Sequence, residues 1–220
     1  MPDPTLDLTP DELLTTTRAV RRRLDVERPV PDELIRECVS IAMQAPSASN
    51  NMTMQFVVVR DPAKRRAIGD VYRRCYEIYK GLDGVYVGSI QKDTEVEQQQ
   101  QRRVQTSADH LGEHLADAPV HVIACTRGRV NDKPANVVAA LTGNVLPAMW
   151  SFMLAARARG LGTAWTTVHL MQEQQVAEIV GIPFGEVQQL CLSPLAYTIG
   201  TDFRPAERPA PDTIIHWDRW

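Results

Sequence analysis

The fold of this chain is decided by residues 155–165, which read Ala155-Ala156-Arg157-Ala158-Arg159-Gly160-Leu161-Gly162-Thr163-Ala164-Trp165. Residues 145–159 form the most apolar segment and are apolar nearly all round, which is typical of a central helix. Gly160 is expected to end that helix, and residues 164–168 are a strand candidate. A helix that leads into a strand, without a third glycine, reverses the order of a dinucleotide-binding fingerprint. The stretch therefore predicts a helix stop and a tight turn.

Upstream of this stretch, the sequence predicts three helices and a strand. The start signal Thr9-Pro10-Asp11-Glu12 predicts a first helix that runs toward residue 19 or 20. Apolar residues at three-to-four spacing predict a second helix over residues 31–45, followed by a loop. The β-branched run at residues 56–59 predicts a strand. Asp61-Pro62 then predicts a third helix, whose apolar face continues to Tyr79.

The remainder of the chain alternates weakly apolar and strongly apolar segments. Residues 81–110 lose their apolar periodicity, so they predict a surface excursion or a lid. Residues 120–125 predict a buried strand, residues 172–180 a short helix, and residues 190–199 a last strand broken by Pro194. About six helices and four or five short strands in irregular order predict an α+β fold, and residues 1–220 are expected to form a single domain.

Composition excludes several classes of function. The chain has 220 residues, of which 44% are hydrophobic, and its 24 Lys and Arg against 27 Asp and Glu give a net charge of −3. No overall field therefore favours nucleic acid or an anionic membrane, and no run approaches the roughly 18 apolar residues of a membrane span. The 4 cysteines form no CxxC pair, which favours buried free thiols in a reducing compartment. We expect a cytoplasmic protein whose partners include neither nucleic acid nor a membrane.

Two short motifs have a simpler interpretation than the site they suggest. His110-Leu111-Gly112-Glu113-His114 matches the HxxEH pattern of one class of zinc protease. A zinc site needs a third ligand in an enclosed cleft, whereas this segment follows a Gln-rich polar stretch, so we expect a solvated helix face and no metal. The run Arg21-Arg22-Arg23 lies beside Asp25 and Glu27 without interleaved aromatic residues, which favours a basic turn or a phosphate clamp over a nucleic-acid patch.

Three segments together resemble the nitroreductase family of flavoproteins, over nearly the whole chain from about residue 15. Thr17-Arg18-Ala19-Val20-Arg21 looks like the family's opening RxSxR pattern. Ala45-Pro46-Ser47-Ala48-Ser49-Asn50 is similar to its APSxxN loop, and residues 155–165 are similar to its AARxxGLGTxW stretch. Arg208-Pro209 resembles its last basic phosphate contact. The resemblance implies a nitroreductase-like α+β fold with a central mixed sheet of four to five strands, flanked by helices, and a long central helix.

The same resemblance implies FMN as cofactor, in a homodimer with FMN at the subunit interface. Arginines at the basic helix end and near the C-terminus would hold the phosphate, because guanidinium groups give several donors to one anion. The main-chain amides of Thr167 and Val168 would face the flavin ring, so no catalytic side-chain acid or base is required. The donor at the flavin N1 and C2-oxygen edge is not assigned. The implied cofactor-binding residues are Arg18, Ala19, Arg21, Pro46, Ser47, Ala48, Asn50, Thr166, Thr167, Val168 and Arg208.

Two departures from the family pattern concern the acceptor and the phosphate. Met52-Thr53-Met54 stands where the family often has Gln-Pro-Trp, so Met52 and Met54 are expected to form an adaptable substrate wall. Ala19 replaces the usual serine, which removes one hydroxyl donor to the phosphate.

The resemblance implies an NAD(P)H oxidoreductase. NADH or NADPH would reduce FMN, and a nitroaromatic, a quinone or a similar small acceptor would then be reduced in the same space, with ping-pong kinetics. The departures leave two alternatives open. One is a flavin-binding or flavin-storage protein with little turnover, and the other is a specialised flavin reductase such as a dehalogenase.

Overall fold

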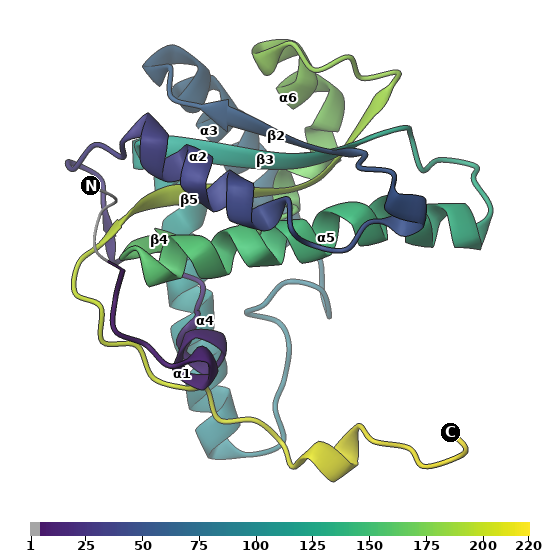
Figure 1. The fold of residues 1–220 in the computed structure, drawn as a ribbon. Helices are drawn as coiled ribbons and strands as arrows, with labels where there is room; N and C mark the ends of the chain where they lie inside the picture. The colour runs from purple at the N-terminus through teal and green to yellow at the C-terminus, as the bar shows by residue number, and fades with distance from the viewer. Residues whose placement is uncertain (1–4) are drawn as a thin grey trace.

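The computed structural model describes residues 5–220, in which helices pack on both faces of one sheet (Figure 1). The α-helices are α1 (Pro10–Thr16), α2 (Asp32–Ala42), α3 (Pro62–Lys80), α4 (Glu95–His114), α5 (Ala135–Ala158) and α6 (Glu173–Val180). The strands are β1 (Leu24–Asp25), β2 (Met54–Val59), β3 (Val120–Arg127), β4 (Leu161–Thr163) and β5 (Val187–Thr198). The 3-10 helices are η1 (Ala48–Asn50), η2 (Leu115–Asp117), η3 (Val168–Gln172) and η4 (Pro211–Thr213). The predicted α+β fold with a long helix is confirmed.

The sheet is antiparallel at every strand pairing in the described chain, which corrects the expectation of a mixed sheet. Its strand order is β1-β5-β3-β2, and β4 pairs with β5. Two helices, α3 and α4, connect β2 to β3, so the chain returns in the opposite direction, whereas a single crossover helix would have made the strands parallel. Among residues 5–220, parallel contacts occur only as the isolated bridges Ala19 to Thr163 and Gly128 to Val187.

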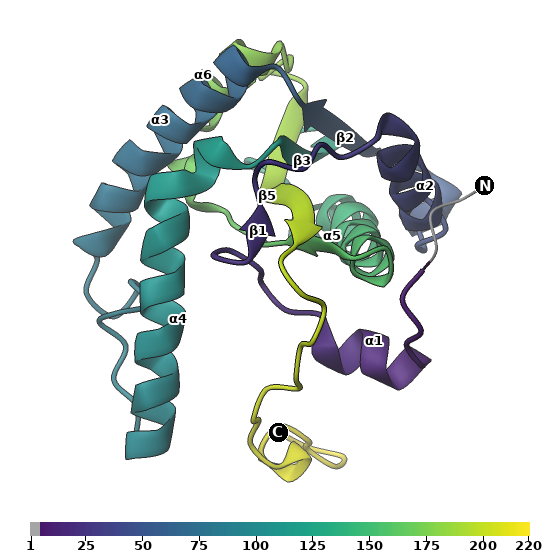
Figure 2. The same ribbon diagram turned by 90° about the vertical axis from the view of Figure 1, so that its left-hand side faces the viewer.

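The two faces of the sheet carry separate hydrophobic clusters. Helices α2 and α5 cover one face, and α3 and α6 cover the other (Figure 2). Successive strand residues point to opposite faces, so Val122 packs with Phe152 of α5 while Ile123 packs with Tyr72 of α3. All four of these side chains are at most 2% exposed. Because β3 is covered on both sides, every residue of the strand except Arg127 is buried, and its sequence does not alternate between apolar and polar residues.

Two predicted helix starts are confirmed in detail, and one predicted end is wrong. Thr9 and Glu12 form a reciprocal capping box at α1, and Asp61 accepts backbone N–H groups at the start of α3. Helix α1 ends at Thr16 and does not continue to residue 19 or 20. The cause lies in the sheet, because Val20 donates its N–H to the Thr163 carbonyl of β4, which draws the chain into an extended course.

Most of the 20-residue helix α4 lies in the segment that was predicted as a surface excursion, and the sequence analysis expected a helix only at the HxxEH motif near its end. A capping box between Thr94 and Glu97 starts it. Its N-terminal half extends away from the body, while Leu111 and Gly112 are buried at its other end (Figure 2). Gly112 permits this packing, since a Cβ there would lie 2.5 Å from the Tyr76 ring. A helix with so little buried surface shows no apolar stripe in its sequence.

The long helix α5 begins ten residues before the predicted start at Val145 and ends at Ala158, just before Gly160, whose φ of 71° agrees with the predicted helix stop. In the described chain it is the one helix long and apolar enough to cross a membrane by length and composition, so the prediction that no such run exists is wrong. Met149 and Phe152 are fully buried in the core, as in the core helix of a globular protein. Only 33% of its most apolar window is buried, so part of its apolar surface is open.

The two strands that follow α5 differ from prediction in position or continuity. Strand β4 covers Leu161–Thr163, earlier than the predicted residues 164–168. Gly162 permits it, because a Cβ at this residue would lie 2.9 Å from the Val20 side chain. Strand β5 runs unbroken through Pro194, where a break was predicted. Proline removes one ladder hydrogen bond, but its fixed φ is compatible with an extended strand.

Candidate functional site

Four of the predicted cofactor-binding residues line one cavity of about 400 Å³. Arg21 lies on one side, and the consecutive residues Thr166–Val168 lie on another. Aromatic rings form much of the remaining wall, chiefly three tyrosines of α3 and Trp165. The structure therefore brings together two segments that are separated by about 145 residues in the sequence, as the sequence analysis expected.

The sheet holds both segments in place. Ala19 and Val20 run beside Thr163 of β4, which fixes the backbone that carries Arg21. Thr166 exchanges two backbone hydrogen bonds of 2.9 Å with Leu192 of β5. Beyond this bridge the chain turns into η3, and Thr167 is exposed. Among residues 5–220, no hydrogen bond occupies the main-chain N–H of Thr167, so this donor is available to a ligand.

The tyrosines give the cavity a nearly uncharged wall. The Tyr72 hydroxyl and the Thr166 hydroxyl share a hydrogen bond of 2.9 Å, and burial raises the pKa of Tyr72 to about 12. The hydroxyls of Tyr76 and Tyr86 both donate to Oδ1 of Asp109, at 3.0 and 2.7 Å. Because Asp109 belongs to α4, these bonds attach α4 and the segment before it to the cavity wall.

Arg21 supplies the positive charge in the cavity wall, and aromatic side chains surround it. Desolvation lowers its pKa, although the neighbouring tyrosines Tyr72, Tyr76 and Tyr79 act in the opposite direction. A guanidinium remains charged at neutral pH under such a shift. The cavity therefore combines a poorly solvated positive charge with flat walls and one free amide donor.

The remaining predicted phosphate residues lie outside this cavity. Arg18 donates from Nη1 to the Arg204 carbonyl at 3.4 Å, which links the basic segment to the C-terminal segment. Ala19 pairs with Thr163 and offers no side-chain donor. Arg208 is exposed on the C-terminal segment, which extends away from the body of the molecule (Figure 1). The structure therefore groups Arg18 with the start of this segment but leaves Arg208 apart.

The loop at residues 46–50 and the two methionines form a second, separate region. The loop contains η1, and it packs beside α5 on the face that α2 covers. Met52 and Met54 line a cavity of about 670 Å³ between α2 and the edge strand β2. Met54 is 5% exposed and Met52 is 49% exposed. Within a single chain, the structure does not bring these residues together with Arg21, because the two regions lie on opposite faces of the sheet.

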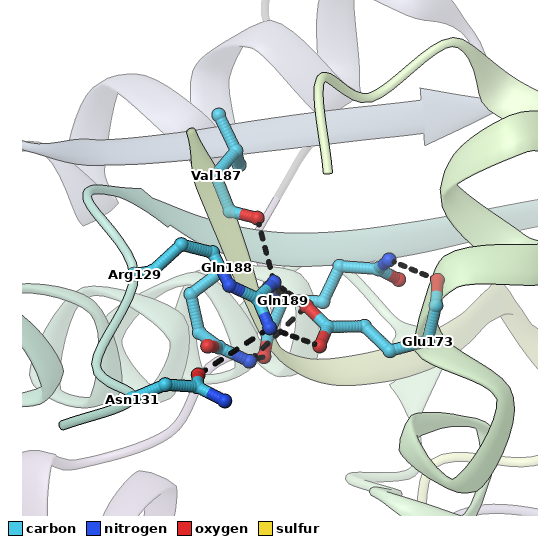
Figure 3. A network of polar contacts seen from close by, with 6 residues as sticks. All are labelled: Arg129, Asn131, Glu173, Val187, Gln188 and Gln189. Atoms are coloured by element: carbon cyan, nitrogen blue, oxygen red, sulfur yellow. Dashed lines mark hydrogen bonds and ion pairs between the residues drawn. The ribbon is translucent and has the colours of Figure 1, made fainter. Parts of the chain in front are cut away.

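A polar network that the sequence analysis missed anchors the end of η3 (Figure 3). Arg129 binds Glu173 through two hydrogen bonds, of 2.8 and 3.0 Å, and both side chains are less than 20% exposed. Oε1 of Glu173 also accepts from the Gln189 N–H at 2.8 Å and from Nε2 of Gln188 at 3.1 Å. Glu173 begins α6, directly after η3, so the network fixes the segment that carries Thr167 and Val168.

A second residue that the sequence analysis missed is Asn144, a polar residue inside the apolar helix α5. It is 2% exposed and hydrogen-bonds the backbone of the 46–51 loop. A buried amide in an otherwise apolar helix is the sequence signal that could have identified it, because such a group requires partners. The tyrosines at positions 72, 76 and 79 follow helical spacing, which could similarly have predicted a common wall.

The HxxEH motif lies on α4. The His114 ring is 4.4 Å from the His110 ring, and its Nδ1 lies 2.9 Å from a carboxylate oxygen of Asp117. Within residues 5–220, no three His, Cys, Asp or Glu side chains gather where they could hold a metal ion.

Comparison with known proteins defines the class. A family model described as the nitroreductase family matches residues 14–200. The chain therefore belongs to the nitroreductase family, and the predicted resemblance is confirmed.

Individual relatives are distant. A protein of Methanothermobacter thermautotrophicus, named as a putative NADH dehydrogenase/NAD(P)H nitroreductase, is 26% identical over 217 residues, which cover 95% of this chain and 86% of the relative. An FMN- and NADPH-dependent nitroreductase of Sphigopyxis sp. strain HMH superposes with a TM-score of 0.66 at 19% identity, covering 97% of this chain and 100% of that one. Oxidised iodotyrosine deiodinase, bound to FMN and 3-iodo-L-tyrosine, superposes with a TM-score of 0.68 at 18% identity, covering 96% and 99%. These two structures support the fold.

Proposed function

We propose that the chain binds FMN and uses it to pass electrons from NADH or NADPH to a small acceptor such as a nitroaromatic or a quinone. The observation that carries this proposal is the cavity that Arg21 shares with Thr166–Val168. Its aromatic walls, single cation and free Thr167 N–H fit a flavin ring, which is flat, becomes electron-rich on reduction and accepts hydrogen bonds at its nitrogens. FMN, when bound, supplies the atom that accepts hydride and passes the electrons on.

Arg21 and Thr167 would have different roles toward the ring. The Thr167 N–H would donate to the hydride-accepting atom without introducing a titrating group. Arg21 would face the edge where reduction places negative charge, since a poorly solvated cation there interacts strongly with that charge. This role differs from the phosphate contact predicted for Arg21, because aromatic side chains surround it. Arg18 and Arg208 are left as the proposed phosphate ligands.

We also propose a homodimer in which a second copy completes each site. The loop at residues 46–50 and Met52 lie on the face of the sheet opposite Arg21, so one chain supplies only part of the pocket. Helix α5 packs against η1 near one end and against β4 at the other, and it leaves Leu146 and Trp150 39% and 40% exposed. Pairing two α5 surfaces about a two-fold axis would bury this apolar surface. The same pairing would place one copy's loop against the other copy's Arg21 cavity.

The dimensions of the cavity favour ping-pong turnover. A space of about 400 Å³ is within the usual range for one small ligand. With a flavin ring in place, it would leave room for a nicotinamide or an acceptor in turn, but not for both. The adaptable Met52 side chain of the second copy would then contact either one.

The proposal is tested by the absorbance spectrum of the purified dimer. We expect an oxidised-flavin spectrum, an extractable cofactor that is FMN and not FAD, and rapid bleaching when NADPH or NADH is added anaerobically. A yellow protein that neither nucleotide bleaches would support flavin storage, and activity on halogenated phenols without activity on nitro compounds would support dehalogenation. A colourless protein that FMN cannot reconstitute would overturn the proposal.

A further inference from the structure

Asn144 fastens the 46–51 loop to the central helix. Its Oδ1 accepts the Ala48 N–H at 2.5 Å, and its Nδ2 donates to the Asn51 carbonyl at 3.0 Å and to the Thr53 hydroxyl at 2.9 Å. Thr53 is held in turn by the Thr126 hydroxyl of β3 at 2.9 Å. One buried side chain therefore binds both ends of η1, and all of its hydrogen-bonding groups have partners.

The loop has little else to hold its shape. Pro46, Ala48, Ser49 and Asn50 are exposed, and the two backbone hydrogen bonds within the loop, at 3.2 and 3.0 Å, are both made across single turns. Ser49 and Asn50 have φ values of 54° and 52°, which lie in the left-handed region. Residues other than glycine adopt two such conformations in succession only when the surrounding structure enforces them. The hydrogen bonds of Asn144 lie on either side of this pair.

We propose that Asn144 is a positioning residue for the flavin. It would fix the conformation in which the 46–50 loop of one copy meets the cofactor held by the other. This inference rests on the proposed function, because the loop matters only if a flavin lies against it. Asn144 would not touch the cofactor and would act through the backbone at Ala48 and Asn51.

The amide is suited to this role because it donates and accepts at the same point. An aspartate could accept from Ala48, but its carboxylate would face the Asn51 carbonyl, and the two oxygens would repel each other. A leucine of similar size would leave the Ala48 N–H without its partner. Either change removes bonds that flank the left-handed pair, so the loop is expected to relax toward extended conformations.

The test compares Asn144→Leu with wild type, using Thr142→Val as the matched control. Thr142 lies on the same helix and bonds only to carbonyls of that helix, so its replacement leaves the loop intact. The readouts are the FMN dissociation constant, the visible circular dichroism of the bound flavin, and the midpoint of apoprotein unfolding. We expect FMN to bind at least about tenfold more weakly in Asn144→Leu, with altered visible dichroism, and we expect Thr142→Val to match wild type.

Rescue separates positioning from general destabilisation. Adding Ser49→Gly to Asn144→Leu should recover part of the lost affinity, because glycine adopts a positive φ without strain. If Asn144→Leu does not fold, Thr53→Val removes one of the three partners by a nearly isosteric change, and we expect FMN binding to weaken by roughly two- to tenfold.

Failure of the inference differs from failure of the proposed function. Wild-type protein that does not bind FMN would contradict the proposed function. Wild-type protein that binds FMN, beside an Asn144→Leu or Thr53→Val variant with the same affinity and the same dichroism, would contradict the positioning role alone. A lower unfolding midpoint with unchanged FMN binding would also contradict it.

Discussion

Replacing Glu173 by Gln tests whether the network in Figure 3 anchors the segment that carries Thr167 and Val168. Gln keeps an acceptor for the Gln189 N–H but places an NH₂ group where Oε2 now accepts from Arg129 at 3.0 Å. The guanidinium would lose its counter-charge while its side chain stays 19% exposed. The change is therefore nearly isosteric and acts on charge and hydrogen bonding alone.

The size of the effect follows from the burial of the pair. Removing one member of a poorly exposed ion pair costs roughly 3–5 kcal/mol, because the remaining charge has no partner in a medium of low polarity. For a chain of this length, each kcal/mol lowers the unfolding midpoint by about 2–4 °C. We therefore expect Glu173→Gln to lower the midpoint by roughly 6–20 °C.

Thermal unfolding of the apoprotein, followed by far-ultraviolet circular dichroism at one fixed protein concentration, measures this effect. Asp70→Asn is the matched control, because the pair of Asp70 with Arg73 is 58% and 48% exposed and should contribute no more than about 1 kcal/mol. Equal shifts in the two variants would refute the reasoning, since burial would then not distinguish the pairs.

Four further outcomes are expected. Arg18→Ala and Arg208→Ala should each weaken FMN binding by roughly 10- to 100-fold and leave the rate of hydride transfer at saturating FMN unchanged. If fluorescence titrations show unchanged FMN binding for either variant, the arginine replaced in that variant lies outside the phosphate site. Arg21→Gln should make the flavin reduction potential more negative by roughly 30–60 mV in spectroelectrochemical titration, and an unchanged potential would argue against a cation at the ring edge. Burial lowers the pKa of His169 to about 3 and of His121 to about 4, so the unfolded chain binds more protons than the folded chain below about pH 6.5. The free energy of unfolding should therefore fall as the pH drops from about 6.5 toward these pKa values, by up to about 1.4 kcal/mol per pH unit for each histidine. In urea titrations across this pH range, His169→Phe should lose stability less steeply than wild type, and an equal pH dependence would contradict the assignment. Chelators should leave activity unchanged, and loss of stoichiometric zinc together with activity would restore the metal interpretation of the HxxEH motif.

Local signals in the sequence predicted the parts of the fold that depend on neighbouring residues. The start of α3 follows from Asp61-Pro62, and the end of α5 follows from Gly160, because a cap or a positive φ is a property of a few consecutive residues. The greater part of helix α4 was missed because most of its surface is exposed, so no apolar stripe marks it. The bounds of β4 depend on contacts with Val20, which lies far away in the sequence.

The site was predictable only as far as family motifs reached. Arg21 and Thr166–Val168 share a cavity as expected, but no motif showed that tyrosines of α3 form its wall. Glu173 lies 44 residues from Arg129, and Asn144 lies 96 residues from Ala48. Such pairs are set by how the helices pack on the sheet, which the pattern of a single sequence does not specify. The separation of the 46–50 loop from Arg21, on opposite faces of the sheet, is likewise set by packing and is not visible in the sequence pattern.

The presence of Trp165 in the wall of the Arg21 cavity gives the protein an optical reporter of its own. Indole emission overlaps the absorption of oxidised flavin, so a flavin bound in this cavity would quench Trp165 by energy transfer at short range. Trp217 and Trp220 are 78% and 99% exposed on the C-terminal segment, and their emission would lie further to the red. Filling of the cavity can thus be followed without a label, as a loss of the blue part of the emission, and Trp165→Phe would reduce that loss.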